Sequence, residues 1–360
     1  MKLLITGICG FVGSSLAKAL LERKDGVSIW GIDNLVRPGS ELNRARLREL
    51  GVTVAHGDVR MASDFESLPA VDWVIDAAAN PSVLAGIQEG FSSRQLMEHN
   101  LNSVVNVLEY CKTHGAGLLL MSTSRVYSIE ALASLPLRLQ PDAFCLDETA
   151  QLPPGISACG IGVGFSTRAP ISLYGSTKLA AEALALEYSQ AFDFPVWINR
   201  CGVLAGAGQF GTPDQGVFSY WIHAHAGRRS LRFIGFDGTG KQTRDLFHPR
   251  DLAVLADLQM NCARSGGQRI YCAGGGPSNA ISLAQLTSWC NQRFGPHAPA
   301  ADPNPRPYDI PWVIMDSSDA RRDFAWRVEY PLAKILDEIA EHADRNPDWL
   351  EKSGLERSLT

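Results

Sequence analysis

The stretch that decides the fold is MKLLITGICGFVGS, residues 1–14. Residues 3–6 have the apolar character of a short buried strand, and residues 14–21 take up the apolar period of a helix. Between the two, Gly7, Gly10 and Gly13 follow one another at three-residue steps. Such glycines let the backbone approach a pyrophosphate, and the helix N-terminus offers unpaired N–H groups and a partial positive charge. The stretch therefore predicts a dinucleotide site.

An acidic residue follows the second predicted strand. Residues 27–32 (VSIWGI) form this strand, and Asp33 comes directly after it. A carboxylate about 20 residues beyond the glycines accepts hydrogen bonds from an adenosine ribose and repels a 2′-phosphate. The sequence thus favours NAD over NADP as the cofactor.

Further strands alternate with helices along the first 200 residues. Strand-like stretches lie at residues 52–55, 72–79, 117–122 and 194–200, and residues 91–114 predict a long amphipathic helix. This order indicates a parallel sheet with helices on both faces, which binds ligands beyond the carboxyl ends of its strands. We expect an α/β fold, a Rossmann-type doubly wound parallel sheet with a smaller mixed α/β C-terminal substrate lobe.

The expected domain boundaries follow from where this alternation fades. Residues 1–201 are expected to form the NAD-binding domain, with a loop-rich insertion at residues 128–172. Residues 202–345 are expected to form mainly the substrate lobe, and residues 346–360 a polar tail that frays.

The composition is that of an ordinary enzyme of the cytoplasm. The chain has 360 residues, of which 45% are hydrophobic, and a formal net charge of −5, which argues against a nucleic-acid surface. No stretch is long and apolar enough to predict a membrane span. The eight cysteines are scattered without metal-ligand spacing, which predicts reduced thiols and no metal site. His223 and His225, two residues apart on a predicted helix, point to different sides and are interpreted as structural.

A tyrosine and a lysine four residues apart open a later helix. Tyr174 and Lys178 lie on one face of that helix. An ammonium beside a phenol, with a cationic nicotinamide nearby, favours the phenolate and lowers a pKa that starts near ~10, so that Tyr174 can take a proton from a sugar hydroxyl. Tyr330 and Lys334 have the same spacing, but they follow no glycine turn and no hydroxyl-bearing strand end. We interpret this second pair as structural.

Hydroxyl and arginine side chains complete the predicted crevice. The fifth strand ends in STSRVY, residues 122–127, which places hydroxyls at the mouth of the crevice. Arg244 and Arg306 are candidates for clamping a substrate diphosphate, because a guanidinium matches phosphate oxygens at two points. The alternative interpretation is a salt bridge to Asp245 or Asp309.

Together these motifs resemble the extended short-chain dehydrogenase/reductase family, in its nucleotide-sugar-modifying branch. The resemblance covers roughly residues 1–345 and rests on TGICGFVG (residues 6–13), Asp33-Asn34, Asp58-Val59, STSRVY, YGSTK (residues 174–178) and RDLFHPRD (residues 244–251). It implies Thr123, Tyr174 and Lys178 as the catalytic set. The motifs and the resemblance predict cofactor contacts from Gly7, Gly10, Phe11, Val12, Gly13, Asp33, Asn34, Asp58, Val59, Ala77, Ala78, Ala79, Asn100, Ser122, Tyr174 and Lys178. They predict substrate contacts from Thr123, Arg125, Arg200, Gln209, Gln215, Arg244, Arg306 and Asp309.

The residues after Thr123 narrow the implied reaction. Sugar-nucleotide 4,6-dehydratases of the family carry an Asp-Glu pair there, and the related decarboxylases carry a glutamate just before the valine. This chain has Ser124 and Arg125 instead, so the resemblance implies epimerisation, in which a hydride leaves the sugar and returns. Ser128, where the family usually has glycine, and Asp76, in place of a frequent histidine, depart from the pattern.

The segments QFGTPDQG (residues 209–216) and GTGKQTRDLFH (residues 238–248), with the insertion before Tyr174, are similar to the branch of CDP-tyvelose (CDP-paratose) 2-epimerases. A UDP-sugar 4-epimerase would share every catalytic residue, and a sugar reductase would consume the cofactor. A non-catalytic NAD-binding scaffold or sensor is the alternative of another class, against which the intact catalytic set argues. The resemblance implies a CDP- or UDP-linked sugar as substrate and a homodimer formed by the helices that start near Phe91 and Tyr174.

Overall fold

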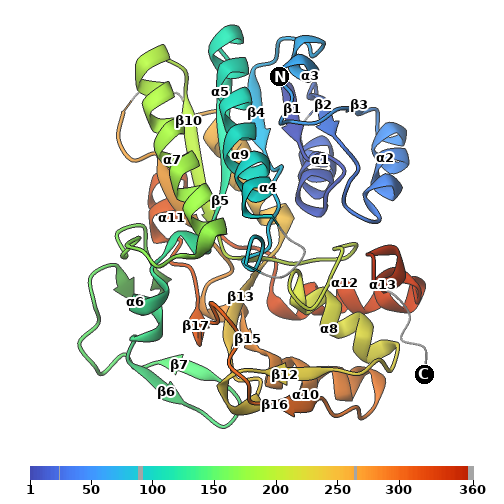
Figure 1. Cartoon of the computed structure of the whole chain (residues 1–360), viewed down its shortest axis with the longest axis vertical. Coiled ribbons are helices and arrows are strands. Elements are labelled where there is room, and N and C mark those ends of the chain that lie inside the picture. Colours follow the sequence, from blue (N-terminus) through green and yellow to red (C-terminus); the bar gives the residue numbers. More distant parts are fainter. Residues whose placement is uncertain (24, 88–91, 263–265, 356–360) are drawn as a thin grey trace.

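The larger part of the molecule, here called the Rossmann half, is built on a seven-stranded parallel sheet (Figure 1). The computed structural model describes residues 1–23, 25–87, 92–262 and 266–355. The strand order is β14-β10-β5-β4-β1-β2-β3, and each neighbouring pair is parallel. The bounds are β1 (Lys2–Thr6), β2 (Ser28–Asp33), β3 (Thr53–His56), β4 (Trp73–Asp76), β5 (Gly117–Thr123), β10 (Val196–Cys201) and β14 (Ile270–Ala273). The predicted Rossmann-type fold class is confirmed.

Helices cover both faces of this sheet because successive residues of each strand point to opposite sides. On one face Leu3 and Ile5 share a hydrophobic core with α1 (Phe11–Arg23), α9 (Pro249–Met260) and α11 (Ser318–Phe324). On the other face Leu4 and Val74 pack with α3 (Ala62–Glu66), α5 (Ser103–His114) and α7 (Ser172–Phe192). The remaining helices of this half are α2 (Ser40–Glu49), α4 (Ser93–Met97) and the π-helical turn η1 (Glu98–Asn102).

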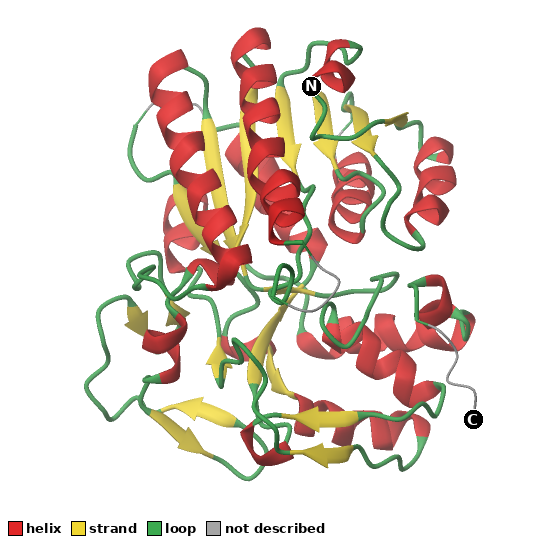
Figure 2. Cartoon of the chain, viewed as in Figure 1, coloured by secondary structure: helices red, strands yellow, loops and turns green. Residues whose placement is uncertain are grey.

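The smaller part, here called the second lobe, lies beyond the arrowheads of the parallel strands (Figure 2). Its mixed sheet joins β13 in parallel to β11 and β17 and antiparallel to β15. Its helices bury a separate core around Trp221 and Ile339. The bounds are β11 (Val203–Leu204), β13 (Thr243–Phe247), β15 (Ala280–Ser282), β17 (Trp312–Val313), α8 (Val217–Ala226), α10 (Leu283–Phe294), α12 (Leu332–Arg345), α13 (Trp349–Lys352), the pair β12 (Arg232–Ile234) and β16 (Ala300–Asp302), and the turns η3 (Phe236–Gly238) and η4 (Pro277–Asn279).

The insertion at residues 128–172 is more ordered than a loop. It contains α6 (Ile129–Ala133) and the antiparallel pairs β6 (Leu137–Leu139) with β7 (Phe144–Leu146) and β8 (Ile156–Ser157) with β9 (Gly160–Ile161). Ile161 and Phe165 share a core with Trp312 and Met315 of the second lobe. Buried apolar side chains therefore fasten the insertion to that lobe.

Three features differ from the sequence-based expectations. The seventh strand, β14, comes from the segment expected to form mainly the substrate lobe, so the chain returns to the first half after residue 201. The expected fraying tail instead contains α13, whose Trp349 and Leu350 are buried. The helix expected at residues 91–114 is described from Ser93, with Phe91 outside the described residues, and it contains the π-helical turn η1.

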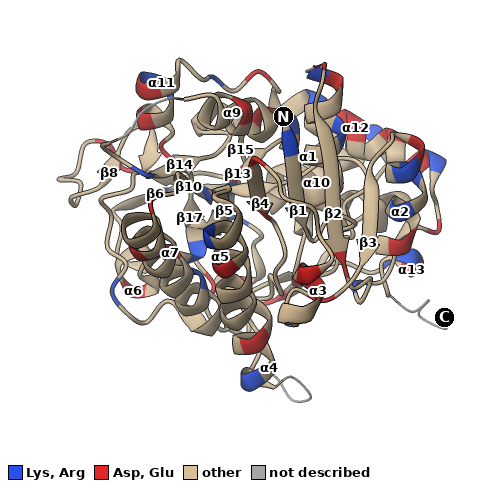
Figure 3. Ribbon diagram, turned by 90° about the horizontal axis from the view of Figure 1, so that it is seen from above, with Lys and Arg blue, Asp and Glu red and all other residues tan. Residues whose placement is uncertain are grey.

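Charged residues lie mostly on the outer helices. In the view of Figure 3, basic and acidic segments alternate along α2, α11 and α12. Among the described residues, no helix has both the length and the apolar character needed to cross a bilayer.

Candidate active site

The glycine turn after β1 has the shape that its sequence predicts. Gly7 adopts a φ of +61°, and a Cβ on it would lie 2.9 Å from the Cα of Ala78. A Cβ on Gly13 would overlap the carbonyl oxygen of Gly7. A Cβ on Gly10, by contrast, would meet only that same oxygen within 4 Å, at 3.1 Å, so the space above Gly10 is open. The turn thus leaves a cradle at the N-terminus of α1, where a pyrophosphate fits.

Asp33 stands at the end of β2 beside this turn. Its carboxylate accepts hydrogen bonds from the amides of Cys9, at 2.9 Å, and Leu35, at 2.8 Å. Burial raises the pKa of Asp33, and these amide hydrogen bonds act in the opposite direction. A carboxylate has about four lone-pair sites, so the Asp33 oxygens can still accept from a ribose diol. The residues present therefore fit the adenosine end of NAD.

Thr6 holds the ends of β1 and β4 together under the cradle. Its hydroxyl donates to Asp76 Oδ1 at 2.5 Å and accepts from the amides of Ala77 and Ala78 at 3.2 and 3.1 Å. The second oxygen of Asp76 is buried and has no partner among the described residues. Burial raises the pKa of Asp76, while the ammonium of Lys178 acts to lower it.

Asp58 and Val59, two more of the predicted cofactor contacts, also lie together. Asp58 accepts from Arg60 Nε at 2.9 Å and from Asn34 Nδ2 at 3.0 Å, and Arg60 holds the pKa of Asp58 well below its usual range. Val59 lies beside them, with its carbonyl bound by Asn106. Whether these groups contact an adenine stays a prediction.

Asn100 has a bracing position in the turn η1. Its amide group exchanges two hydrogen bonds with the backbone of Asn80, at 2.7 and 2.9 Å, and donates to Thr177 at 3.4 Å. It therefore ties the loop after β4 to the helix that carries the tyrosine. A π-helical turn widens the helix locally, and such turns are frequent at functional sites.

The structure brings the three predicted catalytic residues together. Thr123 ends β5, and Tyr174 and Lys178 lie in the first two turns of α7. The hydroxyl of Thr123 faces the phenol of Tyr174 and acts on its pKa. The buried ammonium of Lys178 donates to the carbonyl of Met121 at 3.1 Å, which leaves two further N–H groups for a ligand. An alcohol, a phenol and an ammonium thus line the carboxyl end of the sheet.

Burial dominates the electrostatics of this trio in the protein alone. Burial raises the pKa of Tyr174 to about 12, and Thr123 and Arg125 act to lower it. Burial lowers the pKa of Lys178, whose ammonium faces Asp76, Cys201 and Glu182. In the protein alone, the cost of burying a phenolate outweighs the nearby positive charge, and the lowering expected beside a cationic nicotinamide stays a prediction.

Three of the predicted arginines form a cluster with Asp309. Arg125 donates to the carbonyl of Tyr308 at 3.1 Å, Arg244 lies 3.6 Å from Asp309 Oδ1, and Arg306 lies 2.5 Å from Asp214 Oδ1. Burial, together with the charges of Arg125 and Arg306, lowers the pKa of Arg244 to about 10. Both arginines proposed as a diphosphate clamp have a carboxylate partner, as the alternative interpretation required, although for Arg306 that partner is Asp214.

Two other residues that were predicted to contact ligands bind another side chain of the protein instead. Arg200 is buried and its guanidinium binds Glu182, with Nη2 2.6 Å from Oε2, so its prediction as a substrate contact is wrong. The hydroxyl of Ser122 donates to the same Glu182, which directs it into the core and away from a cofactor.

The side chains of Gln209 and Gln215 also hold the protein together. Gln209 binds the carbonyl of Leu204, and Gln215 accepts from Arg37 at 2.7 Å. The structure therefore gives both glutamines a structural contact in place of the predicted substrate contact. Arg37 had no signal in the sequence. Glu182, also missed, lies four residues after Lys178, and this spacing on the tyrosine face could have revealed it.

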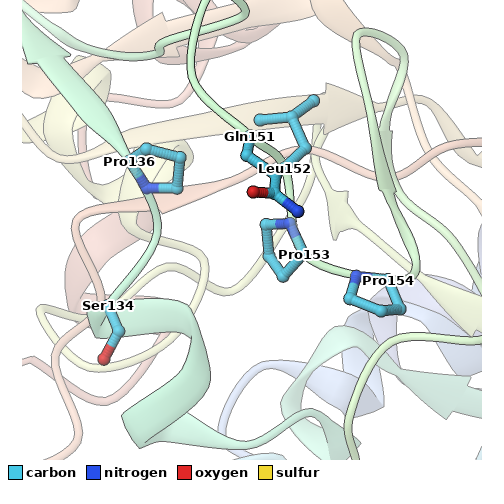
Figure 4. Close-up of a pocket in the computed structure, with 6 residues that line it drawn as sticks. All are labelled: Ser134, Pro136, Gln151, Leu152, Pro153 and Pro154. Carbon is cyan, nitrogen blue, oxygen red and sulfur yellow. The ribbon is translucent and has the colours of Figure 1, made fainter.

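Two hollows open on the insertion, away from the trio. One, of about 400 Å³, is lined by Ser134, Pro136, Gln151, Leu152, Pro153 and Pro154 (Figure 4). The other, of about 470 Å³, shares Ser134 with it. Neither lining includes Thr123, Tyr174 or Lys178, so the candidate active site is defined by its side chains and by the glycine cradle.

The fold and the site define a dinucleotide-binding protein of Rossmann type with a threonine, a tyrosine and a lysine at the end of its fifth strand. The chain belongs to the NAD dependent epimerase/dehydratase family, whose sequence pattern matches residues 3–274. The predicted family and its cofactor, NAD, are thereby confirmed.

Individual relatives differ in substrate. The chain is 27% identical over 303 residues to CDP-paratose 2-epimerase from Salmonella typhi, covering 81% of this chain and 85% of that one. It is 25% identical over 350 residues to UDP-glucose 4-epimerase from Corynebacterium glutamicum, covering 94% of each. Its fold is similar to that of UDP-glucuronic acid 4-epimerase from Bacillus cereus, with a TM-score of 0.75, 22% identity and coverage of 96% and 99%.

Proposed function

We propose that the protein is an NAD-dependent epimerase of nucleotide-diphosphate sugars. One carbinol of the sugar is oxidised to a ketone and then reduced from its other face, so that no net oxidation occurs. The observation that carries the proposal is the convergence of Thr123, Tyr174 and Lys178 at the carboxyl end of the sheet, beside a cradle that fits a pyrophosphate.

Each residue of the trio has one task in this reaction. Tyr174, as a phenolate, accepts the proton of the sugar hydroxyl and later returns it. Thr123 donates a hydrogen bond to the same oxygen, and Lys178 binds the nicotinamide ribose with the N–H groups that Met121 leaves free. When bound, NAD would supply a hydride acceptor that gives the hydride back, and the positive charge of its nicotinamide ring would offset the cost of the buried phenolate.

The residues next to Thr123 support epimerisation over elimination. In the family that this chain resembles, the dehydratases and decarboxylases carry carboxyl groups at these positions, where they can act as acid or base. At these positions the chain has Ser124, which is buried, and Arg125, whose guanidinium cannot exchange a proton at neutral pH. The keto-sugar therefore loses neither water nor carbon dioxide and is reduced again.

For the substrate we propose a CDP-linked hexose or deoxyhexose that is inverted at C2. The match to CDP-paratose 2-epimerase and the segment 209–216 support this choice. Arg244 and Arg306 would bind the diphosphate by exchanging Asp309 and Asp214 for phosphate oxygens. A UDP-sugar 4-epimerase is the second candidate, supported by the match to UDP-glucose 4-epimerase over 94% of the chain.

The proposal includes a homodimer. Helices α5 and α7 lie side by side on one face of the sheet and pack on a common core (Figure 1). A second copy of these helices would complete a four-helix contact. Light scattering on the eluting protein would give the mass, and a monomer would contradict this part alone.

The test of the activity is direct. The cofactor is released from the purified protein and identified, and the protein is then incubated with a panel of CDP- and UDP-sugars followed by proton NMR. We expect NAD, an equilibrium mixture of two C2 epimers and no net change in cofactor redox state. Epimerisation at C4 of a UDP-sugar would select the second candidate, and no exchange with any sugar would overturn both.

A further inference from the structure

Residues 205–216, here called the strap, join β11 to α8 in the second lobe. The strap is ordered by contacts within its own lobe. Thr212 and Gln215 exchange two backbone hydrogen bonds, at 2.7 and 3.2 Å, and the indole of Trp349 donates to the carbonyl of Gln209 at 2.9 Å. The strap therefore has a defined shape with which to meet the Rossmann half.

One end of the strap lies against the glycine cradle. A Cβ on Gly206 would lie 3.4 Å from Cζ of Phe11 and 3.2 Å from Nε2 of His248. Phe11 is the first residue of α1 and directly follows Gly10, above which the cradle is open. This end of the strap thus borders the place where a pyrophosphate fits.

The other end of the strap is fastened to the loop between β2 and α2. Arg37 lies in this loop, four residues after Asp33, and is half-buried. It donates from Nη1 to Gln215 Oε1 at 2.7 Å and from Nη2 to the carbonyl of Phe210 at 2.6 Å. The ring of Phe210 packs so closely on Gly39 that a Cβ there would lie 2.6 Å from Cε1. Two charge-assisted hydrogen bonds and a packed ring therefore join the two halves here.

The loop that carries Arg37 is itself positioned by Asp33. Leu35 adopts a φ of +57°, in the left-handed region, which a leucine keeps only where its surroundings hold it. Its amide donates to Asp33 Oδ1 at 2.8 Å. Asp33 is also the carboxylate that fits the adenosine ribose. The group that meets the cofactor thus orders the loop whose arginine fastens the strap.

We propose that the strap closes over the adenosine diphosphate end of the cofactor site, and that Arg37 is the positioning residue that fastens it and thereby slows the release of NAD. The strap touches the Rossmann half beside the cradle, at Phe11, and beyond Asp33, at residues 37–39. A dinucleotide bound between the cradle and Asp33 has to pass the strap when it leaves.

The inference rests on the proposed function for its catalytic meaning. An epimerase has to keep its cofactor bound until the sugar that it oxidised has been reduced again, so slow release prevents the loss of a half-finished turnover. The rate of NAD release, however, is measured without any sugar, and the closure can therefore be tested separately from the activity.

Three variants and one control test the closure. Arg37→Met keeps the apolar stem and removes both hydrogen bonds, Arg37→Lys keeps the charge, and Gln215→Glu gives Arg37 a charged acceptor. The matched control is Arg228→Met. The guanidinium of Arg228 also donates to backbone carbonyls, those of Phe294 and Pro296 at 2.6 Å each, but these bonds stay within the second lobe.

Release is followed on NAD-loaded protein mixed with an excess of alcohol dehydrogenase and ethanol, which reduce each released NAD molecule to a form with its own near-ultraviolet absorbance. The unfolding temperature of every variant is measured by circular dichroism. Epimerisation is followed in parallel by proton NMR.

We expect Arg37→Met to release NAD about tenfold faster or more, because both hydrogen bonds of a charged group are lost. Arg37→Lys should lie between this variant and the parent, and Gln215→Glu should release NAD more slowly than the parent. Arg228→Met should release NAD at the parent rate even where its unfolding temperature falls.

Release at the parent rate from folded Arg37→Met overturns the inference, and so does an equal acceleration in Arg228→Met, which would reflect general destabilisation. Faster release from Arg37→Met alone, in a protein that epimerises no sugar, would sink the proposed function and leave the closure intact.

Discussion

Glu182 and Arg200 form a buried ion pair beneath the candidate active site, with 2.6 Å between Oε2 and Nη2 and a further bond from Nε to Oε1 at 3.0 Å. Their side chains are only 2% and 5% exposed. Glu182 also accepts from Ser122, so the pair links α7, β10 and β5 where the trio is carried. A charge left alone at this depth would be costly.

We therefore expect Glu182→Ala to lower the free energy of unfolding by about 3–5 kcal/mol, measured by urea denaturation. The control is Glu341→Ala, which removes an exposed i,i+4 pair with Arg345 and should change stability by less than about 0.5 kcal/mol. Equal effects of the two substitutions would show that the buried pair contributes no more to the free energy of unfolding than the exposed pair.

Tyr174→Phe should reduce turnover by a factor of about 100 or more, because it removes the only phenol of the trio while the ring still fills its place. Cofactor content, measured after release from the protein, should stay unchanged. Tyr330→Phe is the matched control, since Tyr330 shares the four-residue spacing to a lysine but stacks on His248 in the second lobe. Near-normal activity of the Tyr174 variant would refute its role as the base.

Asp33→Ser should weaken NAD binding by about tenfold or more, since hydrogen bonds to a charged group contribute about 1.5–3 kcal/mol. The same change should improve NADP binding, because it removes the charge that repels a 2′-phosphate. Calorimetric titration with both cofactors measures the ratio. Asp25→Ser, which removes an exposed acid from the same half, controls for net charge and should leave the ratio unchanged.

Asp245 makes stability depend on pH. Its carboxylate is fully buried, Oδ2 accepts from the amides of Gly276 and Met315, and Oδ1 has no partner among the described residues. Burial raises its pKa from 3.8 to about 6. The folded protein thus binds this proton more tightly than the unfolded chain. The resulting stability is fully present below pH ~4 and is lost as the pH rises through about 6.

The loss corresponds to about 3 kcal/mol, at 1.36 kcal/mol for each unit of pKa. Asp245→Asn can keep both amide hydrogen bonds through its carbonyl oxygen and does not ionise. The difference in unfolding free energy between the variant and the parent should therefore shift in favour of the variant by about that amount between pH 4 and pH 7. A difference that is constant with pH would contradict the raised pKa.

Local signals predicted the parts of the site that depend on one segment. The strand, glycines and helix of residues 1–21 gave the cradle, and Asp33 follows its strand as expected because the βαβ unit fixes the distance between them. The meeting of Thr123 with Tyr174 needed the parallel sheet as well, and the alternation of strands and helices supplied it.

The predictions that failed concern residues whose contacts come from distant parts of the chain. Arg200 lies at a strand end, as a substrate contact would, but Glu182 on a neighbouring helix neutralises it in the interior. The strand β14 has only four residues, Ile270–Ala273, so its apolar signal in the sequence is weak. Residues 346–360 are mostly polar, yet Trp349 stacks on Phe210 at 5.3 Å and donates to the carbonyl of Gln209. The spacing from Lys178 could have revealed Glu182, but its pairing with Arg200, like the packing of Trp349 on Phe210, depends on the tertiary fold.

The return of the chain to the sheet through β14 bears on how this protein can be dissected. A fragment that stopped at residue 201 would keep every glycine of the cradle and all three residues of the trio, but it would expose the β10 backbone from Ile198 to Cys201, which β14 covers. It would also uncover Trp197, which Phe324 of α11 flanks at 5.4 Å. An unpaired strand at the edge of a sheet, beside an exposed indole ring, promotes aggregation. We therefore expect soluble expression to require the chain beyond residue 201, and a fragment of the nucleotide-binding part alone to be insoluble.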